Sequence, residues 1–123
     1  MNTQQVANRL VELCRRGEFS KAHDELYAQD AVSIEPEGAP GGALGNVRGL
    51  DAIREKGKSF DQTYEKIHGI TVSDPLVSGE FFSLVMGLDA TWKQGGRYAM
   101  EEICVYRVRN GKVVLEQFFY PVG

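Results

Sequence analysis

Residues 27–36 have the sequence YAQDAVSIEP, in which a helical pattern changes into a short strand that ends at a glutamate and a proline. The proline ring favours an extended backbone at Glu35, and Pro36 itself has no amide proton to donate to a sheet. The strand predicted at residues 31–35 therefore ends on a carboxylate. That carboxylate has two interpretations: it is a base inside a pocket, or it is a charged side chain in water.

The segments around this stretch predict three helices. Apolar residues recur at helical spacing over residues 4–16 and again over 18–28, just before the strand. The glycines and prolines of residues 36–49 predict a loop, and no Lys-Ser or Lys-Thr follows at the spacing of a phosphate-binding loop. Residues 50–61 predict a third helix, with Ile53 and Phe60 on its apolar side.

The second half of the chain predicts a sheet. Strand patterns cover residues 67–77, 80–93, 97–108 and 112–120, and hairpin-forming residues separate them. Three helices followed by an antiparallel meander indicate an α+β fold. Because strands of ten or more residues twist and curve strongly, we expect a mainly antiparallel, strongly curved sheet. Wrapped over the three N-terminal helices, it would form a conical barrel that encloses a pocket.

Length and charge narrow the possible functions. The 123 residues fit a single domain, 1–123. The net charge of −3 argues against nucleic acid, which is bound through clustered Lys and Arg. No apolar run is long enough for a membrane span, and the polar N-terminus does not resemble a secretory signal. Cys14 and Cys104 lie in apolar patterns without metal-ligand spacing, so we expect buried free thiols, no metal and a cytoplasmic location.

Three stretches carry a family resemblance: LYAQDAVSIEP, VRGLDAIRE and VYRVRNGKVVLEQFFY. In this order they resemble the nuclear-transport-factor-2-like superfamily, and within it the small SnoaL-like proteins. The resemblance covers nearly the whole chain. It implies a conical α+β barrel with a pocket open at one end, and a homodimer formed through the outer face of the sheet.

Steroid isomerases of this superfamily are similar to the middle of the chain. Their proton-shuttling aspartate precedes a proline, and Glu35–Pro36 falls on that pair. The resemblance puts Glu35 on the cavity face, whereas strand alternation alone favours Val32 and Ile34 in the core and Glu35 in solvent. The isomerases' two oxyanion donors fall on Leu10 and Cys104, which are poor donors. This departure disfavours true steroid isomerisation.

The turn at residues 109–111 decides which side chains of the last two strands share a face. A three-residue loop would place Cys104 opposite Glu116, and a two-residue Asn110-Gly111 loop would shift the pairing by one. By analogy with the family, we predict the three-residue loop. The concave face would then carry seven side chains: Met100, Glu102, Cys104, Tyr106, Glu116, Phe118 and Tyr120.

These observations predict a cofactor-free protein that binds a small apolar molecule. The expected pocket combines that face with residues from the helices: Leu10, Cys14, Tyr27 and Phe60. If the protein is an enzyme, we expect acid–base chemistry on a carbonyl compound of the isomerase, cyclase or dehydratase type, with Glu35 as base and His68, Glu102 or Glu116 as partner. The alternative is a binding or interaction module without catalysis, because the oxyanion donors are missing.

Overall fold

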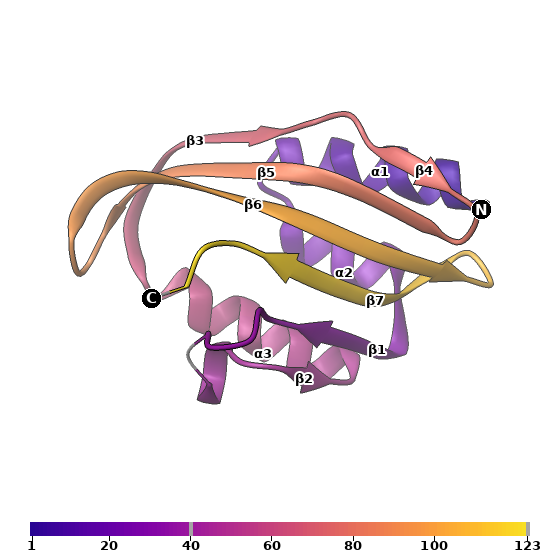
Figure 1. The fold of residues 1–123 in the computed structure, drawn as a ribbon, viewed down its shortest axis with the longest axis horizontal. Helices are drawn as coiled ribbons and strands as arrows, with labels where there is room; N and C mark the ends of the chain where they lie inside the picture. The colour runs from indigo at the N-terminus through magenta and orange to yellow at the C-terminus, as the bar shows by residue number, and fades with distance from the viewer. Residues whose placement is uncertain (40, 123) are drawn as a thin grey trace.

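The computed structural model describes residues 1–39 and 41–122, and its three helices lie behind a curved sheet in Figure 1. Asn2 caps the first helix by accepting from the Gln5 amide, while the Gln5 side chain accepts from the Asn2 amide. Gly17, with φ 72°, follows its C-terminal end in the left-handed conformation typical of helix stops. The helices are α1 (Thr3–Arg15), α2 (Phe19–Leu26) and α3 (Leu50–Asp61).

Seven strands form one mixed sheet in the order β2-β1-β7-β6-β5-β3, with β4 also paired to β5. Strand β1 runs parallel to β7, and the other pairs are antiparallel. The long strands β5 and β6 curve across the whole molecule (Figure 1). The strands are β1 (Tyr27–Ile34), β2 (Val47–Arg48), β3 (Tyr64–Val72), β4 (Leu76–Ser78), β5 (Phe81–Trp92), β6 (Gly96–Arg109) and β7 (Lys112–Phe119); a short 3-10 helix covers Gly42–Leu44.

The predicted α+β class is confirmed, with differences at particular elements. The helix predicted over residues 18–28 ends at Leu26, and Tyr27 already begins β1. The strand predicted over residues 67–77 is two strands, β3 and β4, because the chain leaves the ladder at residues 73–75, where Pro75 has no amide to donate. The parallel pairing of β1 with β7 makes the sheet mixed, which the meander pattern did not indicate.

The apolar core lies between the helices and the inward face of the sheet. Val6, Leu10 and Leu13 of α1 are almost fully buried there. Phe82 and Tyr106, on neighbouring strands, stack with ring centroids 4.7 Å apart. Both cysteines are free and buried in the same core, as predicted. No helix of the described residues is long and apolar enough to cross a membrane.

The predicted three-residue loop between β6 and β7 is wrong. Asn110 and Gly111 both have positive φ, 51° and 73°, and form a two-residue loop that pairs Arg109 with Lys112. A β-bulge at Val114 then shifts the register by one residue, so that Glu116 lies opposite Tyr106. The loop and the bulge together move the pairing by two residues from the prediction, and an even shift leaves each side chain on its predicted face.

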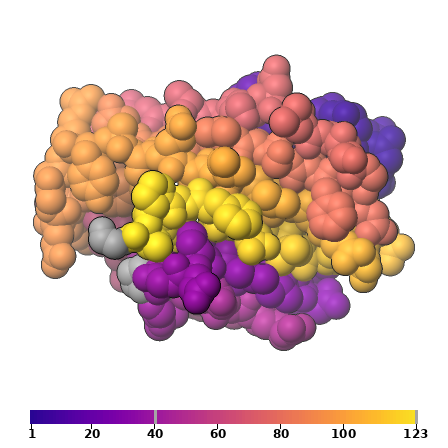
Figure 2. Space-filling model, in the orientation of Figure 1, coloured from indigo at the N-terminus to yellow at the C-terminus, as the bar shows by residue number. Residues whose placement is uncertain are grey.

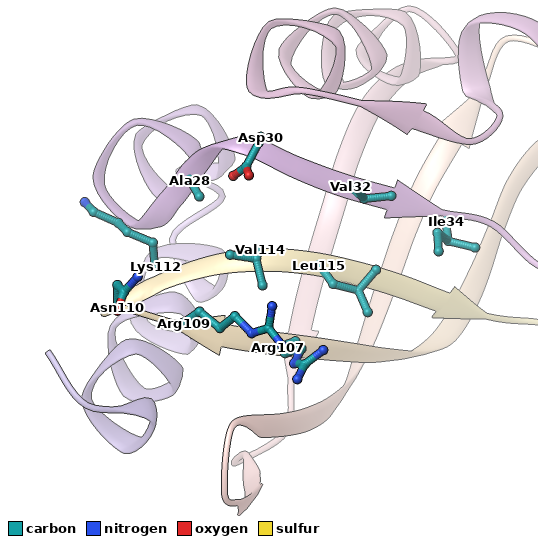
Figure 3. A pocket seen from close by; sticks show the side chains of 10 residues that line it. All are labelled: Ala28, Asp30, Val32, Ile34, Arg107, Arg109, Asn110, Lys112, Val114 and Leu115. Atoms are coloured by element: carbon teal, nitrogen blue, oxygen red, sulfur yellow. The ribbon is translucent and has the colours of Figure 1, made fainter.

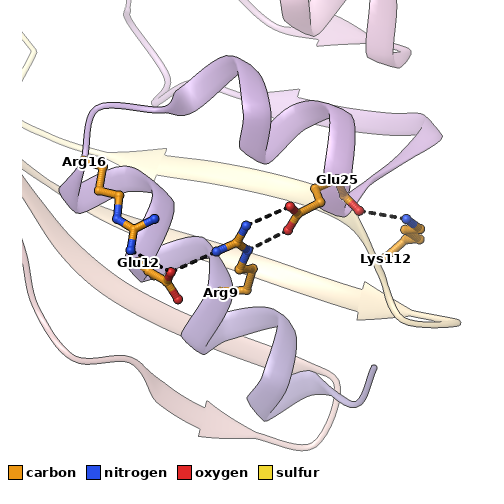
Figure 4. A network of polar contacts seen from close by, with 5 residues as sticks. All are labelled: Arg9, Glu12, Arg16, Glu25 and Lys112. Carbon is orange, nitrogen blue, oxygen red and sulfur yellow. Dashed lines mark hydrogen bonds and ion pairs between the residues drawn. The ribbon is translucent and has the colours of Figure 1, made fainter.

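A network of charged residues joins α1, α2 and the start of β7 on the surface (Figure 4). The Arg9 guanidinium donates twice to the Glu25 carboxylate, at 2.7 and 2.8 Å, and once to Glu12 at 2.9 Å. The Lys112 ammonium donates to the backbone carbonyl of Glu25 at 2.8 Å. The bidentate pair fixes the two helices relative to each other, although its exposure keeps the stabilisation small.

Candidate functional site

The end of β1 holds Glu35 in a fixed position. Glu35 is the first residue after β1; its amide donates to Asn46 Oδ1 at 2.6 Å, and Pro36 follows it directly. Ala31 and Ser33 are fully buried, and the Glu35 side chain is only 13% exposed. The solvent-facing arrangement suggested by alternation alone is therefore wrong: Ala31, Ser33 and Glu35 lie on the inward face.

Helix α3 brings a lysine into the same region. Gly49 adopts φ 95° immediately before α3, and its amide donates to the Ala31 carbonyl at 2.7 Å, which anchors the helix against β1. Lys56 lies on the buried face of α3 with Leu50 and Ile53, and only 9% of its surface is exposed. A buried ammonium needs polar partners, and the neighbouring strands supply them.

The partners of Lys56 come from β1 and β7. Its Nζ donates to Ser33 Oγ at 2.9 Å and lies 3.7 Å from Glu35 Oε2. The same ammonium lies 5.5 Å from the centroid of the Phe118 ring, within cation–π range. Lys56 is thus held by a hydroxyl, a carboxylate and an aromatic face.

A second carboxylate, Glu116, continues the network deeper into the protein. Glu116 is buried, and each of its oxygens accepts one hydrogen bond: from the Tyr27 hydroxyl, which lies in very close contact, and from the Ser33 hydroxyl at 2.7 Å. Burial and the nearby Glu116 raise the pKa of Tyr27 well above its usual value, so that Tyr27 remains a donor. The Lys56 ammonium thus donates a hydrogen bond to the Ser33 hydroxyl, and that hydroxyl donates one to Glu116.

The two oxygens of Glu35 differ in their partners. Oε1 accepts from the Tyr120 hydroxyl at 3.3 Å. Oε2 is buried and accepts no hydrogen bond from the described residues. Burial is the main influence on the Glu35 carboxyl and raises its pKa, while Lys56 and Tyr120 act in the opposite direction. Glu35 therefore has one tethered oxygen and one oxygen free to accept a proton.

A third carboxyl, Glu102 on β6, lies close enough to interact with Glu35. Burial, followed by the charge of Glu35, raises the pKa of Glu102 to about 7. The Cys104 thiol donates to Glu102 Oε1 at 3.6 Å. A carboxyl that titrates near neutral pH beside a free carboxylate oxygen is an arrangement that can accept and return protons. We name these side chains the inward cluster: Tyr27, Ser33, Glu35, Lys56, Glu102, Cys104, Glu116, Phe118 and Tyr120.

The structure leaves other predicted site residues outside the inward cluster. His68 is exposed on β3, and its Nε2 lies 2.7 Å from Thr91 Oγ1. Phe60 packs against the rings of Tyr64 and Trp92. Leu10 and Cys14 belong to the apolar core with Tyr106, and Met100 is half-buried farther along β6.

The predicted site residues did not include Lys56, although the structure places it in the inward cluster. A signal was present, because residues 50, 53 and 56 follow the spacing of one helix face and the first two are leucine and isoleucine. A lysine at an apolar position of an amphipathic helix indicates a buried partner. Because lysine is usually exposed at the surface, Lys56 was not predicted to be buried.

A separate hollow of about 550 Å³ lies on the outer face of the sheet. Figure 3 shows it between β1 and β7, with the ends of β6 and β7 contributing basic side chains. Val32 and Ile34, the alternate residues of β1, line it together with Arg107 and Lys112. Because successive strand residues point to opposite faces, this hollow lies across the sheet from Ser33 and the inward cluster.

A family model described as a SnoaL-like domain matches residues 1–120. The chain belongs to the SnoaL-like family. A Mesorhizobium loti protein described as a candidate SnoaL-like polyketide cyclase is 33% identical; the match covers 98% of this chain and all of that one, with a TM-score of 0.87. None of the curated proteins matches the chain at a meaningful level.

More distant solved structures, among them nuclear-transport-factor-2-like proteins from Burkholderia species, share the fold of this SnoaL-like chain. One is a Catenulispora acidiphila protein in complex with trimethylamine: 16% identity, 97% and 87% coverage of the two chains, TM-score 0.72. Another is TerC, co-crystallised with polyporic acid: 14% identity, 95% and 89% coverage, TM-score 0.77. At these identities the likeness concerns the fold.

Proposed function

We propose that this SnoaL-like protein binds a small apolar carbonyl compound and that Glu35 acts on it as a cofactor-free proton-transfer base. The observation that carries the proposal is the free Oε2 of Glu35, buried and without a hydrogen-bond donor among the described residues. A general base needs a lone pair that no protein group occupies and a pKa displaced toward working pH. Burial moves the pKa of Glu35 upward, in that direction.

The edge of the inward cluster supports access for a ligand. Ser33, Lys56 and Glu116 are buried, whereas Glu35, Glu102, Phe118 and Tyr120 keep part of their surface in solvent. A molecule that approaches over these half-buried side chains would meet aromatic rings first and the Glu35 carboxylate next. This order suits an apolar compound with a single reactive polar group.

Two finer features belong to the same proposal. We infer a homodimer through the outer face of the sheet, because Phe81, Ile103 and Phe119 of β5, β6 and β7 are exposed apolar side chains, and Ile103 lies opposite Phe119. Figure 2 shows the segments that carry these strands, coloured from orange to yellow, across one face of the molecule. We also infer a reducing compartment such as the cytoplasm, because Cys14 and Cys104 are free thiols.

The small molecules bound by two fold relatives, trimethylamine and polyporic acid, support a ligand-binding role without indicating the ligand of this chain. The Leu10 side chain has no hydrogen-bond donor and the Cys104 thiol is a weak one, which argues against steroid isomerisation. Isomerase, cyclase and dehydratase reactions share a first step in which a base removes a proton next to a carbonyl. That step can be assayed before the physiological substrate is known.

The test is deuterium incorporation from D2O into a panel of ketones, quinones and enones, followed by NMR. The wild-type protein should accelerate exchange at the carbon next to the carbonyl for at least one compound. Glu35→Gln should slow that exchange by about 10²- to 10⁴-fold, the usual contribution of a general base. Glu37→Gln is the matched control, because Glu37 is exposed two residues away.

Each outcome decides between catalysis and binding. Exchange that depends on Glu35 and not on Glu37 supports the proposal. Tight binding of a compound without exchange would favour the binding module instead. Unchanged exchange in Glu35→Gln would exclude Glu35 as the base.

A further inference from the structure

We propose that Lys56 is the group that stabilises the negative charge formed on the substrate oxygen when Glu35 removes a proton. This inference rests on the proposed function and adds the second half of the reaction. The resemblance to steroid isomerases puts Leu10 and Cys104 at the positions of their two oxyanion donors, and neither side chain is a strong hydrogen-bond donor. Lys56 lies on α3 and places its ammonium 3.7 Å from the Glu35 carboxylate.

The contacts of Lys56 leave part of its ammonium free for a ligand. An ammonium has three N–H donors, and one of them donates to Ser33. No second hydrogen bond from Nζ occurs among the described residues, and Glu35 Oε2 lies at 3.7 Å, beyond hydrogen-bond distance. The Glu35 oxygen that accepts no hydrogen bond and the Lys56 ammonium, with N–H groups left over, thus lie 3.7 Å apart.

The surroundings of Lys56 hold the ammonium in place. Ser33 fixes its position through a hydroxyl that is itself oriented by Glu116, and the Phe118 ring covers another side. The lysine therefore does not need to reorganise when charge develops on a ligand. A preorganised donor in a partly dehydrated site stabilises an oxyanion more than the same donor in water.

The step balances with these two side chains alone. The C–H bond next to the carbonyl breaks, and its proton passes to Glu35 Oε2. The electron pair of that bond forms a carbon–carbon double bond, and the carbonyl π electrons move to oxygen, which accepts a hydrogen bond from Lys56 Nζ. The protonated Glu35 then returns a proton to carbon, so no oxidant, reductant or cofactor is consumed.

This arrangement defines a substrate class. The substrate should carry a carbonyl group and a hydrogen on the adjacent carbon, so that base and cation act on one enolisable unit. Negative charge in the ground state should weaken binding, because Glu35 already lies 3.7 Å from the ammonium and Glu102 and Glu116 lie nearby. A neutral ketone or enone therefore fits better than a carboxylic acid.

Two variants and a matched control test the role of Lys56. Lys56→Met keeps the length of the side chain and removes the charge, and Lys56→Arg keeps the charge. Loss of one oxyanion donor lowers a rate on the order of 10²- to 10³-fold, so we expect such a loss in the exchange rate of Lys56→Met and partial recovery in Lys56→Arg. Lys58→Met is the control, because Lys58 is 70% exposed on the same helix.

Binding of para-nitrophenol provides a readout that a purely structural lysine would not change. The phenolate is a stable oxyanion, and its visible absorbance reports both binding and ionisation. Glu35→Gln should bind the phenolate more tightly than wild type, because a negative charge beside Lys56 is removed. Lys56→Met in that background should lose the gain, while Lys58→Met should not.

The outcomes separate this inference from the proposed function. If Glu35→Gln abolishes exchange while Lys56→Met exchanges like wild type, the role of Lys56 is wrong and the base stands. If both variants exchange like wild type, the proposed function fails as well. If no compound exchanges at all, phenolate binding that stays unchanged when Lys56→Met is added to Glu35→Gln still excludes Lys56 as an oxyanion donor.

Discussion

The raised pKa of Glu102 predicts a specific dependence of stability on pH. Burial and the charge of Glu35 move the pKa of Glu102 from 4.5 to about 7 in the folded protein. A difference of that size corresponds to about 3 kcal/mol, and solvent at this half-buried side chain reduces the expected effect to about 1–3 kcal/mol. Glu102→Gln removes the titrating group and keeps the shape of the side chain.

The sign follows from proton binding in the two states. Between pH 4.5 and about 7, folded Glu102 retains a proton that the unfolded chain has released. The folded state therefore loses stability as pH rises through this window, and the full penalty is present above it. Below the window both states are protonated and the penalty disappears. The free energy of unfolding of Glu102→Gln minus that of wild type should therefore increase as pH rises through this window.

Urea unfolding followed by Trp92 fluorescence measures this effect, because Trp92 is buried and stacked on Tyr98. The difference between Glu102→Gln and wild type should grow by about 1–3 kcal/mol between about pH 4 and pH 8. Glu101→Gln is the control, since Glu101 is the exposed neighbour on the same strand. Parallel stability curves for Glu102→Gln and wild type would refute the burial of Glu102 and its placement beside Glu35.

Two further predictions concern the interior. Ser33→Ala removes one donor to Glu116 and the acceptor of Lys56, so its free energy of unfolding in urea should fall by about 1–3 kcal/mol. Ser78→Ala is the control, because Ser78 is exposed and its substitution should change the stability little. Equal stabilities of Ser33→Ala and wild type would contradict the network. Burial raises the pKa of Cys14 to about 12, so alkylation of the native protein at mildly alkaline pH should be far slower than in urea. Equally fast labelling in both states would show that the thiol is accessible.

The sequence predicted the fold class because several patterns agree. Helical spacing, hairpin residues and long strand patterns indicated three helices and a curved sheet independently of one another. The register of β6 and β7 could not be derived in the same way, because the two-residue loop at Asn110-Gly111 and the bulge at Val114 shift it in combination. The faces were still predicted correctly, because the loop and the bulge each shift the pairing by one residue and together shift it by two.

The candidate site was predictable in part. Glu35 was found because a proline follows it and because a family resemblance placed it inward. Its partner Lys56 could not be found by the same reasoning, since the contact depends on how α3 crosses β1, which Gly49 sets through its backbone bond to Ala31. His68 illustrates the opposite error: a chemically suitable residue on β3 lies exposed, with its Nε2 against Thr91 Oγ1, and is not part of the inward cluster.

The central claim is that Glu35 transfers a proton to and from a bound carbonyl compound. The most direct measurement is the ratio of deuterium-incorporation rates between wild type and Glu35→Gln, at saturating concentration of the compound that exchanges fastest. We predict a ratio of about 10² or more, with Glu37→Gln equal to wild type. A ratio near one, in a Glu35→Gln protein that still binds the compound, would contradict the claim.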